Sequence, residues 1–207
     1  IGLSADGICG PDTLRSLDLL GARVTGGNPH RISEEELVHR SGPQLTGKRI
    51  VIDPGLGGDD HGRAVETEFG DMYESEILWD LGSRLEGRMA ATGMETFLSR
   101  SHSSNPTDVE RAETSNAFDA DLMISLRCAA NDSPAANGVA SFHFGNSHGS
   151  TSMIGQVLSG FIQREVVART PLQDCRTHGR TWDLLRLTKM PTIQVDIGYL
   201  TNDDDSA

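Results

Sequence analysis

The chain has 207 residues, and 30 Asp and Glu against 18 Lys and Arg give it a net charge of −12. This length suits one full domain with an appendage rather than two large domains. So acidic a chain repels a phosphate backbone and anionic lipids, which disfavours nucleic-acid binding. No apolar run approaches the roughly 20 residues of a membrane span, so direct membrane insertion is not expected.

The three cysteines, Cys9, Cys128 and Cys175, are odd in number and widely spaced. No Cys-x-x-Cys pair occurs, which argues against a disulfide framework and against a thiolate zinc knuckle. Three reduced cysteines favour a reducing compartment, so we expect a cytoplasmic protein. The chain also starts without Met, and we expect it to be a fragment of a longer protein.

Two short pieces precede the main domain. Residues 1–21 contain turn signals and a predicted helix at 12–20, which is too little to bury a core alone. Residues 22–46 are predicted to be a linker with a short helix, because Ser33 and Glu36 form a capping-box pattern between Gly-Pro and Asn-Pro turns.

From residue 47 onward, strand and helix patterns alternate. The predicted strands are 49–53, 94–99, 122–126, 139–144 and 192–197, and the predicted helices are 73–89, 108–118 (capped at Thr107), 150–168 and 182–188. This alternation predicts an α/β fold, a twisted and mostly parallel sheet with helices on both faces.

Two of these helices have an apolar face that should pack on the sheet. The predicted inward positions are Ile77, Leu78, Leu81, Leu85 and Met89 in the first helix, and Ile154, Leu158, Ile162 and Val166 in the third.

Functional groups in such a sheet gather beyond the carboxyl ends of the strands. This rule places residues 53–60, Arg100, Arg127 and Asp196 near one rim. Asp53 is expected to accept backbone N–H bonds that shape the glycine turn after it. That turn lacks the Lys-Ser/Thr of a phosphate-binding loop, so a plain tight turn is the better interpretation.

Four segments at these strand and helix ends resemble the zinc-dependent N-acetylmuramoyl-L-alanine amidases of the type-3 family in order and spacing. They are Val51–Gly58, Glu74–Ile77, Ile124–Ala130 and Met190–Asn202. The resemblance runs from about Lys48 to the end. It implies an amidase-like domain at 47–207 that ends before the family's last helix. Residues 6–14 resemble the end of a peptidoglycan-binding domain of type 1, so residues 1–21 are identified as its C-terminal remnant.

The departures from the family decide the functional expectation. The family binds zinc with His, Glu and His, and uses a further Glu as the catalytic base; these four positions are here Leu56, Glu74, Arg127 and Asp196. Leucine and a protonated guanidinium offer zinc no lone pair. Catalytic zinc needs three protein ligands, so no catalytic residue, no metal site and no zinc are expected, with Glu74 the only retained ligand.

Arg127 suggests what replaced the metal. Glu74 and Asp196 would be left as uncompensated carboxylates in a partly buried site, and a guanidinium between them would neutralise both. We therefore expect an ion pair from Arg127 to Glu74 and Asp196.

Other side chains carry weaker signals. His61 follows two aspartates in the glycine turn, where a histidine could reach the rim and rescue a metal, but an exposed loop histidine is the better interpretation. His143, His148 and His178 are expected to be structural or exposed. No Gly-x-Ser-x-Gly elbow supports a serine hydrolase.

The linker and the Trp182–Arg186 segment most resemble catalytically degenerate actinobacterial members of the family, which are viewed as cytoplasmic regulators of peptidoglycan precursor synthesis. The resemblance implies activation of the UDP-N-acetylglucosamine carboxyvinyltransferase MurA, contact with the lipid II flippase MurJ, and phosphorylation by a serine/threonine kinase. One alternative is a zinc-dependent amidase that cleaves the stem peptide from muramic acid; another is a wall-binding module.

Overall fold

A computed structural model describes residues 44–67 and 70–206. The predictions for residues 1–21 and for 22–43 lie outside the described residues. No helix in the described part of the chain is long and apolar enough to cross a bilayer.

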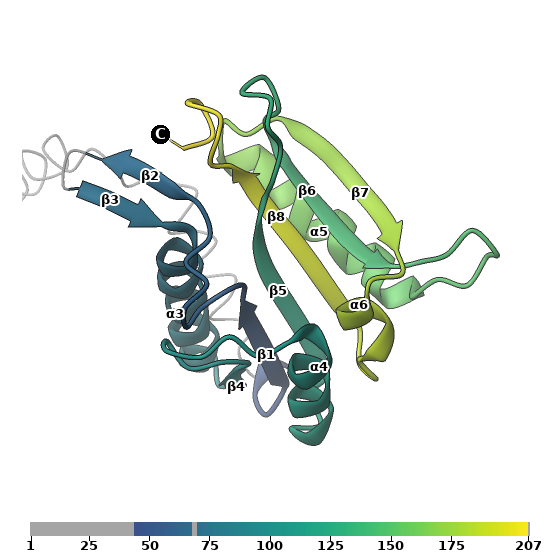
Figure 1. Ribbon diagram of the computed structural model, residues 1–207. Helices are drawn as coiled ribbons and strands as arrows, with labels where there is room; N and C mark the ends of the chain where they lie inside the picture. The colour runs from purple at the N-terminus through teal and green to yellow at the C-terminus, as the bar shows by residue number, and fades with distance from the viewer. Residues whose placement is uncertain (1–43, 68–69, 207) are drawn as a thin grey trace, which may run out of the picture. The chain divides into compact units, whose positions relative to one another are not determined.

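A six-stranded sheet forms the centre of the fold, in the order β4-β1-β5-β8-β6-β7 (Figure 1). Its strands are β1 (Arg49–Pro54), β4 (Glu95–Leu98), β5 (Leu122–Ala129), β6 (Val139–Phe144), β7 (Asp174–Arg180) and β8 (Thr192–Tyr199). The first four strands of the order run parallel, whereas β6 is antiparallel to β8 and parallel to β7. The predicted mostly parallel α/β sheet is therefore confirmed.

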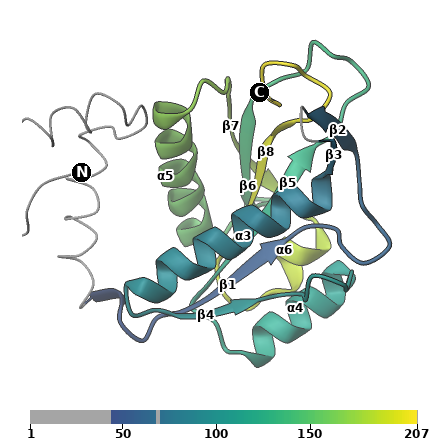
Figure 2. The ribbon, with the colours of Figure 1, turned by 90° about the vertical axis from the view of Figure 1, so that its left-hand side faces the viewer.

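Helices cover both faces of this sheet. The helices are α3 (Glu74–Ala91), α4 (Asp108–Ala117), α5 (Met153–Arg169) and α6 (Asp183–Leu187). Successive strand residues face opposite sides, so β1 directs Ile50 and Ile52 into a core with α3 and α5, and Val51 into a second core with α4 and α6. Figure 2 shows α5 and α4 on opposite sides of the sheet.

The helix starts follow from local sequence. The Thr107 side chain accepts a hydrogen bond from the backbone N–H of Glu110, while the Glu110 carboxylate accepts from the Thr107 N–H at 2.8 Å. This capping box begins α4 where the sequence predicts it. The Glu76 carboxylate similarly accepts from the backbone N–H of Tyr73 at the start of α3.

Two strand features were missed by the sequence patterns. β2 (Ala64–Thr67) and β3 (Gly70–Tyr73) form an antiparallel hairpin, and β3 is exposed along its whole length, so it has no apolar alternation to detect. β7 is an edge strand with the polar sequence DCRTHGR. Charged side chains prevent an edge strand from pairing with other chains. They also replace the apolar alternation by which a strand is recognised in a sequence.

Two inward positions were also wrong. The side chains of Leu81 and Ile154 are 37% and 61% exposed, whereas Leu78 is completely buried between α3 and the sheet. Each misplaced residue lies at the margin of its helix's apolar face, where a small rotation of the helix decides burial.

We expect Leu78→Ala to lower the free energy of unfolding by about 2–5 kcal/mol, because it opens a cavity in the core under α3. Leu81→Ala on the same helix should change it by less than about 1 kcal/mol. Urea unfolding monitored by circular dichroism measures both. Equal losses for the two variants would contradict the packing of α3 described above.

Candidate functional site

The carboxyl ends of β1, β5 and β8 meet at one end of the sheet. The parallel registers place Asp53 beside Ser125, and Arg127 beside Asp196. Since paired residues on neighbouring strands face the same side, these side chains share the sheet face that carries α4 and α6. The predicted gathering of Asp53, Arg127 and Asp196 at one rim is confirmed.

Asp53 is the centre of the hydrogen-bond network at this rim, and its side chain is fully buried. One carboxylate oxygen accepts from Arg111 Nη1 at 2.6 Å and from the Ser99 hydroxyl; the other accepts from the Ser125 hydroxyl at 2.8 Å and lies 2.9 Å from Arg127 Nη1. The prediction that backbone N–H groups donate to Asp53 was therefore wrong, because its donors are side chains. These donors are the side chains of Ser99, directly after β4, of Arg111 in α4, and of Ser125 and Arg127 in β5, and they tie these elements to β1.

The protonation of Asp53 follows from these contacts. Burial by itself raises the pKa of a carboxyl group, but the charges of Arg127 and Arg111 outweigh burial and hold the pKa of Asp53 at about 2. Asp53 is therefore ionised at neutral pH and neutralises part of the positive charge around it.

Arg100 and Arg111 hold the turn after β1. Arg100 Nη2 donates to the carbonyl oxygen of Gly55 at 3.1 Å, and Arg111 Nη2 donates to that of Leu56 at 3.1 Å. Burial, with the nearby charge of Arg111, lowers the pKa of Arg100 to about 10. The turn's shape is thus fixed by guanidinium groups beneath it, and neither Arg100 nor Arg111 was assigned this role from the sequence.

Arg127 does not make the predicted ion pair with Glu74 and Asp196, and that prediction is wrong. Its Nη1 pairs with Asp53 and its Nη2 lies 3.5 Å from the Asp108 carboxylate. The side chain lies against Gly55, where a Cβ would come within 2.6 Å of the Arg127 Cδ. The absence of a side chain at Gly55 leaves room for the guanidinium to reach across β1, and the buried carboxylate of Asp53 binds it there.

Leu56 and Glu74, which the family resemblance assigns to two zinc-ligand positions, lie together. A Cβ at Gly62 would lie 2.5 Å from Leu56 Cδ1 and 2.7 Å from Glu74 Oε2, so both side chains contact the same glycine. Burial raises the pKa of Glu74, although backbone N–H groups of Arg63 and Cys128 oppose the rise. Leu56 itself has a positive φ of 54°, a conformation uncommon for a residue with a side chain.

Asp196 and Cys128 complete the site. The Asp196 carboxylate accepts from Gln194 Nε2 at 2.8 Å, and burial raises its pKa against that bond and the charge of Arg127. Burial, followed by the charges of Glu74 and Asp196, raises the pKa of the Cys128 thiol to about 12. A thiol that stays protonated at neutral pH is a poor nucleophile, so Cys128 offers no covalent chemistry.

These residues do not fit a zinc ion. In the described residues, no group of three or more His, Cys, Asp or Glu side chains is placed to hold a metal. Leu56 has no lone pair, and the Arg127 guanidinium repels a dication and is bound to Asp53. His61 is an exposed loop residue, as expected, and lies against the Tyr73 ring with centroids 5.2 Å apart.

Comparison with known proteins agrees with this fold. The family model for N-acetylmuramoyl-L-alanine amidases matches residues 50–207. The chain belongs to the type-3 N-acetylmuramoyl-L-alanine amidase family.

Among its relatives, the chain is 69% identical over 204 residues to N-acetylmuramoyl-L-alanine amidase CwlM of Mycobacterium tuberculosis, covering 99% of this chain and 50% of CwlM. The linker and the Trp182–Arg186 segment pointed to this relative, and the comparison confirms it. The chain is also 27% identical over 163 residues to the amidase LytC of Bacillus subtilis, covering 79% of this chain and 32% of LytC. It thus spans about half or less of the length of these two relatives.

Solved structures show the same fold. Amidase AmiC2 of Nostoc punctiforme superposes with a TM-score of 0.67 at 22% identity, over 78% of this chain and 85% of that chain. An amidase from Clostridium difficile 630 superposes with a TM-score of 0.69 at 21% identity, over 78% and 84% of the two chains.

Stability should depend on pH through Asp53. Its pKa is lowered from 3.8 to about 2 in the folded chain, so its contribution is complete above pH 4 and is lost as the pH falls towards 2. We expect the wild type to lose roughly 2 kcal/mol more than Asp53→Asn over this interval. Urea unfolding at pH 7, 4, 3 and 2 measures the difference.

Asp80→Asn is the matched control, because Asp80 is an exposed carboxylate on α3 that pairs with the exposed Arg84 one turn away. It should follow the wild-type pH profile. If Asp53→Asn also follows that profile, Asp53 does not have the lowered pKa.

Proposed function

We propose that this chain is a non-catalytic member of the amidase family that works by binding a partner protein. The observation that carries the proposal is the ion pair between Arg127 and Asp53, 2.9 Å apart. Arg127 places a fixed positive charge where the family has a histidine ligand. Without zinc, water keeps a pKa near ~15.7 instead of near ~7, and no hydroxide forms at neutral pH to attack an amide.

The two remaining carboxylates support this reading. Glu74 is held by backbone N–H groups and Asp196 by Gln194, so each has its own partner inside the chain. The hydrogen-bonding capacity of these carboxylates is thus satisfied by groups of the chain itself, as expected of a fold that is retained for binding. An active amidase remains the alternative, and the retained Glu74 and Asp196 are the features that favour it.

The partner follows from the resemblance to CwlM-type proteins. We propose that the complete protein is a cytoplasmic phosphoprotein that activates the carboxyvinyltransferase MurA, with the lipid II flippase MurJ as a further contact and a serine/threonine kinase as its regulator. The net charge of −12 suits binding to a protein rather than to nucleic acid.

We expect protein purified without added metal to hold far less than one zinc per chain and to release no stem peptide from peptidoglycan. Atomic absorption and a peptide-release assay measure this, with LytC of Bacillus subtilis as the active control. Stoichiometric zinc together with release that EDTA abolishes would establish the amidase alternative instead.

The partner is tested separately. Adding the complete, phosphorylated protein to purified MurA should raise the rate of phosphate release from phosphoenolpyruvate in the presence of UDP-N-acetylglucosamine. An unchanged MurA rate at saturating protein would rule out MurA as the regulated partner while leaving the absence of zinc chemistry untouched.

A further inference from the structure

Three aromatic rings and a guanidinium gather where β7 leads into α6. The Phe142 ring lies 4.7 Å from the Trp182 ring and 5.7 Å from the His178 ring, measured between centroids. The guanidinium carbon of Arg180 lies 5.5 Å from the Phe142 centroid and 5.9 Å from that of Trp182. We call these four residues the Arg180–Trp182 cluster.

The cluster lies on the same face of the sheet as the rim described above. Phe142 pairs with Gln194 of β8 and with His178 of β7, and Ala140 pairs with Asp196. Directly paired residues face the same side of a sheet. Phe142 therefore shares a face with Asp196, and it lies two residues along β6 from Ala140, the residue paired with Asp196. Helix α3, in contrast, packs on the opposite face.

Trp182 and Arg180 are both exposed. The Trp182 side chain is 38% exposed and makes no capping bond to α6, although it occupies the N-cap position. Arg180 donates only to the neighbouring carbonyl of Gly179, and within the described part of the chain no carboxylate lies at ion-pair distance from it. His178 Nε2 donates to the carbonyl of Cys175 at 2.8 Å, which holds the ring in place.

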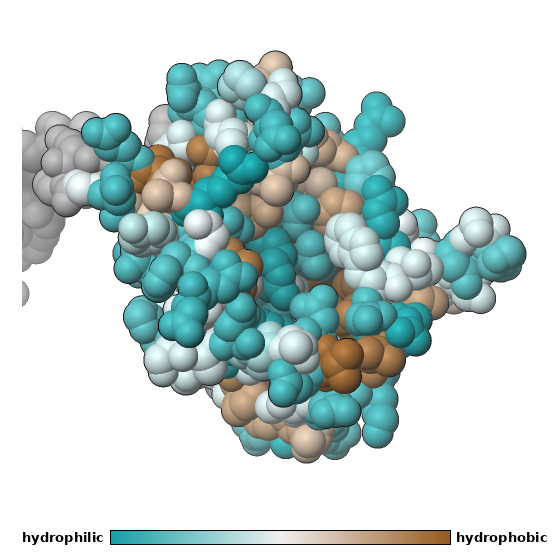
Figure 3. Space-filling model, viewed as in Figure 1, coloured by the Kyte–Doolittle hydropathy of each residue, from teal (hydrophilic) through white to brown (hydrophobic). Residues whose placement is uncertain are grey.

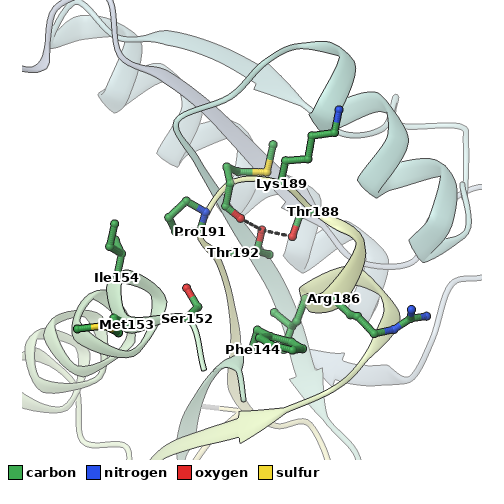
Figure 4. A pocket seen from close by; sticks show the side chains of 11 residues that line it. Phe144, Ser152, Met153, Ile154, Arg186, Thr188, Lys189, Pro191 and Thr192 are labelled. Carbon is green, nitrogen blue, oxygen red and sulfur yellow. Dashed lines mark hydrogen bonds between the residues drawn. The ribbon is translucent and has the colours of Figure 1, made fainter. Parts of the chain in front are cut away.

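A groove of about 660 Å³ adjoins the cluster through Phe144, which pairs with Arg180 across β6 and β7. Its lining comes from β6, the start of α5, α6 and the residues leading into β8, and it includes Arg186 and Lys189 but no Asp or Glu. In Figure 4 the side chains of Arg186 and Lys189 extend outward from the groove. Figure 3 shows apolar surface gathered beside and below α6.

The net charge of this region is opposite in sign to that of the whole chain. Residues 176–189 hold four Arg and Lys against one Asp, a net charge of +3, whereas the chain as a whole carries −12. Of these cations, Arg186 pairs with Asp183 at 2.7 Å, and Lys189 has no carboxylate at ion-pair distance in the described residues. A local positive surface on an acidic protein attracts an acidic partner here, while the acidic surface elsewhere repels that partner.

We propose that the Arg180–Trp182 cluster and the adjoining groove bind an acidic, partly apolar segment of a partner protein. This inference rests on the proposed function, since it locates the surface through which the chain contacts its partner. Carboxylates of the segment pair with the guanidinium of Arg180 and with Lys189, and an apolar side chain covers Trp182. Trp and Arg are the residues that contribute most to binding energy at protein interfaces.

The test is the binding of the complete protein to purified MurA by isothermal titration calorimetry. Arg180→Glu and Trp182→Ala should each weaken binding by about tenfold or more. Arg88→Glu makes the same charge change at an exposed position of α3, on the opposite face, and should weaken binding by less than about twofold. Unchanged far-ultraviolet circular dichroism and melting temperature establish that each variant is folded.

Equal affinities for Arg180→Glu, Trp182→Ala and wild type would overturn the proposed surface while leaving MurA as a partner. If wild type does not bind MurA, the proposed partner is wrong, and photo-crosslinking in cells decides the surface. p-Benzoylphenylalanine replaces Thr181 or, as control, Arg88 in the complete protein. Crosslinks from position 181 to a segment rich in Asp and Glu, lost in Arg180→Glu, support the proposal; crosslinks equal to those of the control, or to a segment without surplus acid, overturn it.

Discussion

The buried carboxylate of Asp53 organises the end of the sheet. It accepts hydroxyl and guanidinium hydrogen bonds from Ser99 at the end of β4, from α4 and from β5, and so fixes the spacing of those elements around β1. A buried carboxylate without partners would cost a large amount of free energy. The two arginines beside Asp53 compensate for this cost, so that its ionised form is the stable one. The same network sets the turn after β1, because Arg111 also donates to the Leu56 carbonyl.

This network changes the meaning of the substitution at Arg127. The family resemblance implied that Arg127 replaces a histidine ligand and supplies the counter-charge of Glu74 and Asp196. The structure instead pairs its guanidinium with Asp53 and Asp108. In the described residues Glu74 and Asp196 consequently make no ion pair with this cation, and burial raises the pKa of each. The site has been incorporated into the structural framework of the rim, which is consistent with the proposed binding role.

Much of the domain was predictable because its helices and central strands carry strong apolar periodicity, and because four family segments lie at the strand ends. The strand β7 was not, since its edge position favours polar residues. The partner of Arg127 was also beyond sequence reasoning: it depends on the space above Gly55 and on a hydroxyl and guanidinium shell around Asp53, contributed by residues far apart in the chain. Pairing by residue type alone favoured Glu74 and Asp196, the two carboxylates that the family resemblance places at the same site.

The central claim, that Arg127 is bound to Asp53 as part of the fold, is tested most directly by a double-mutant cycle. Urea unfolding at pH 7 of wild type, Asp53→Asn, Arg127→Leu and the double variant gives their coupling free energy. The account predicts a coupling of about 2–3 kcal/mol, because either single change leaves a buried charge without its partner. A coupling below about 0.5 kcal/mol would contradict it.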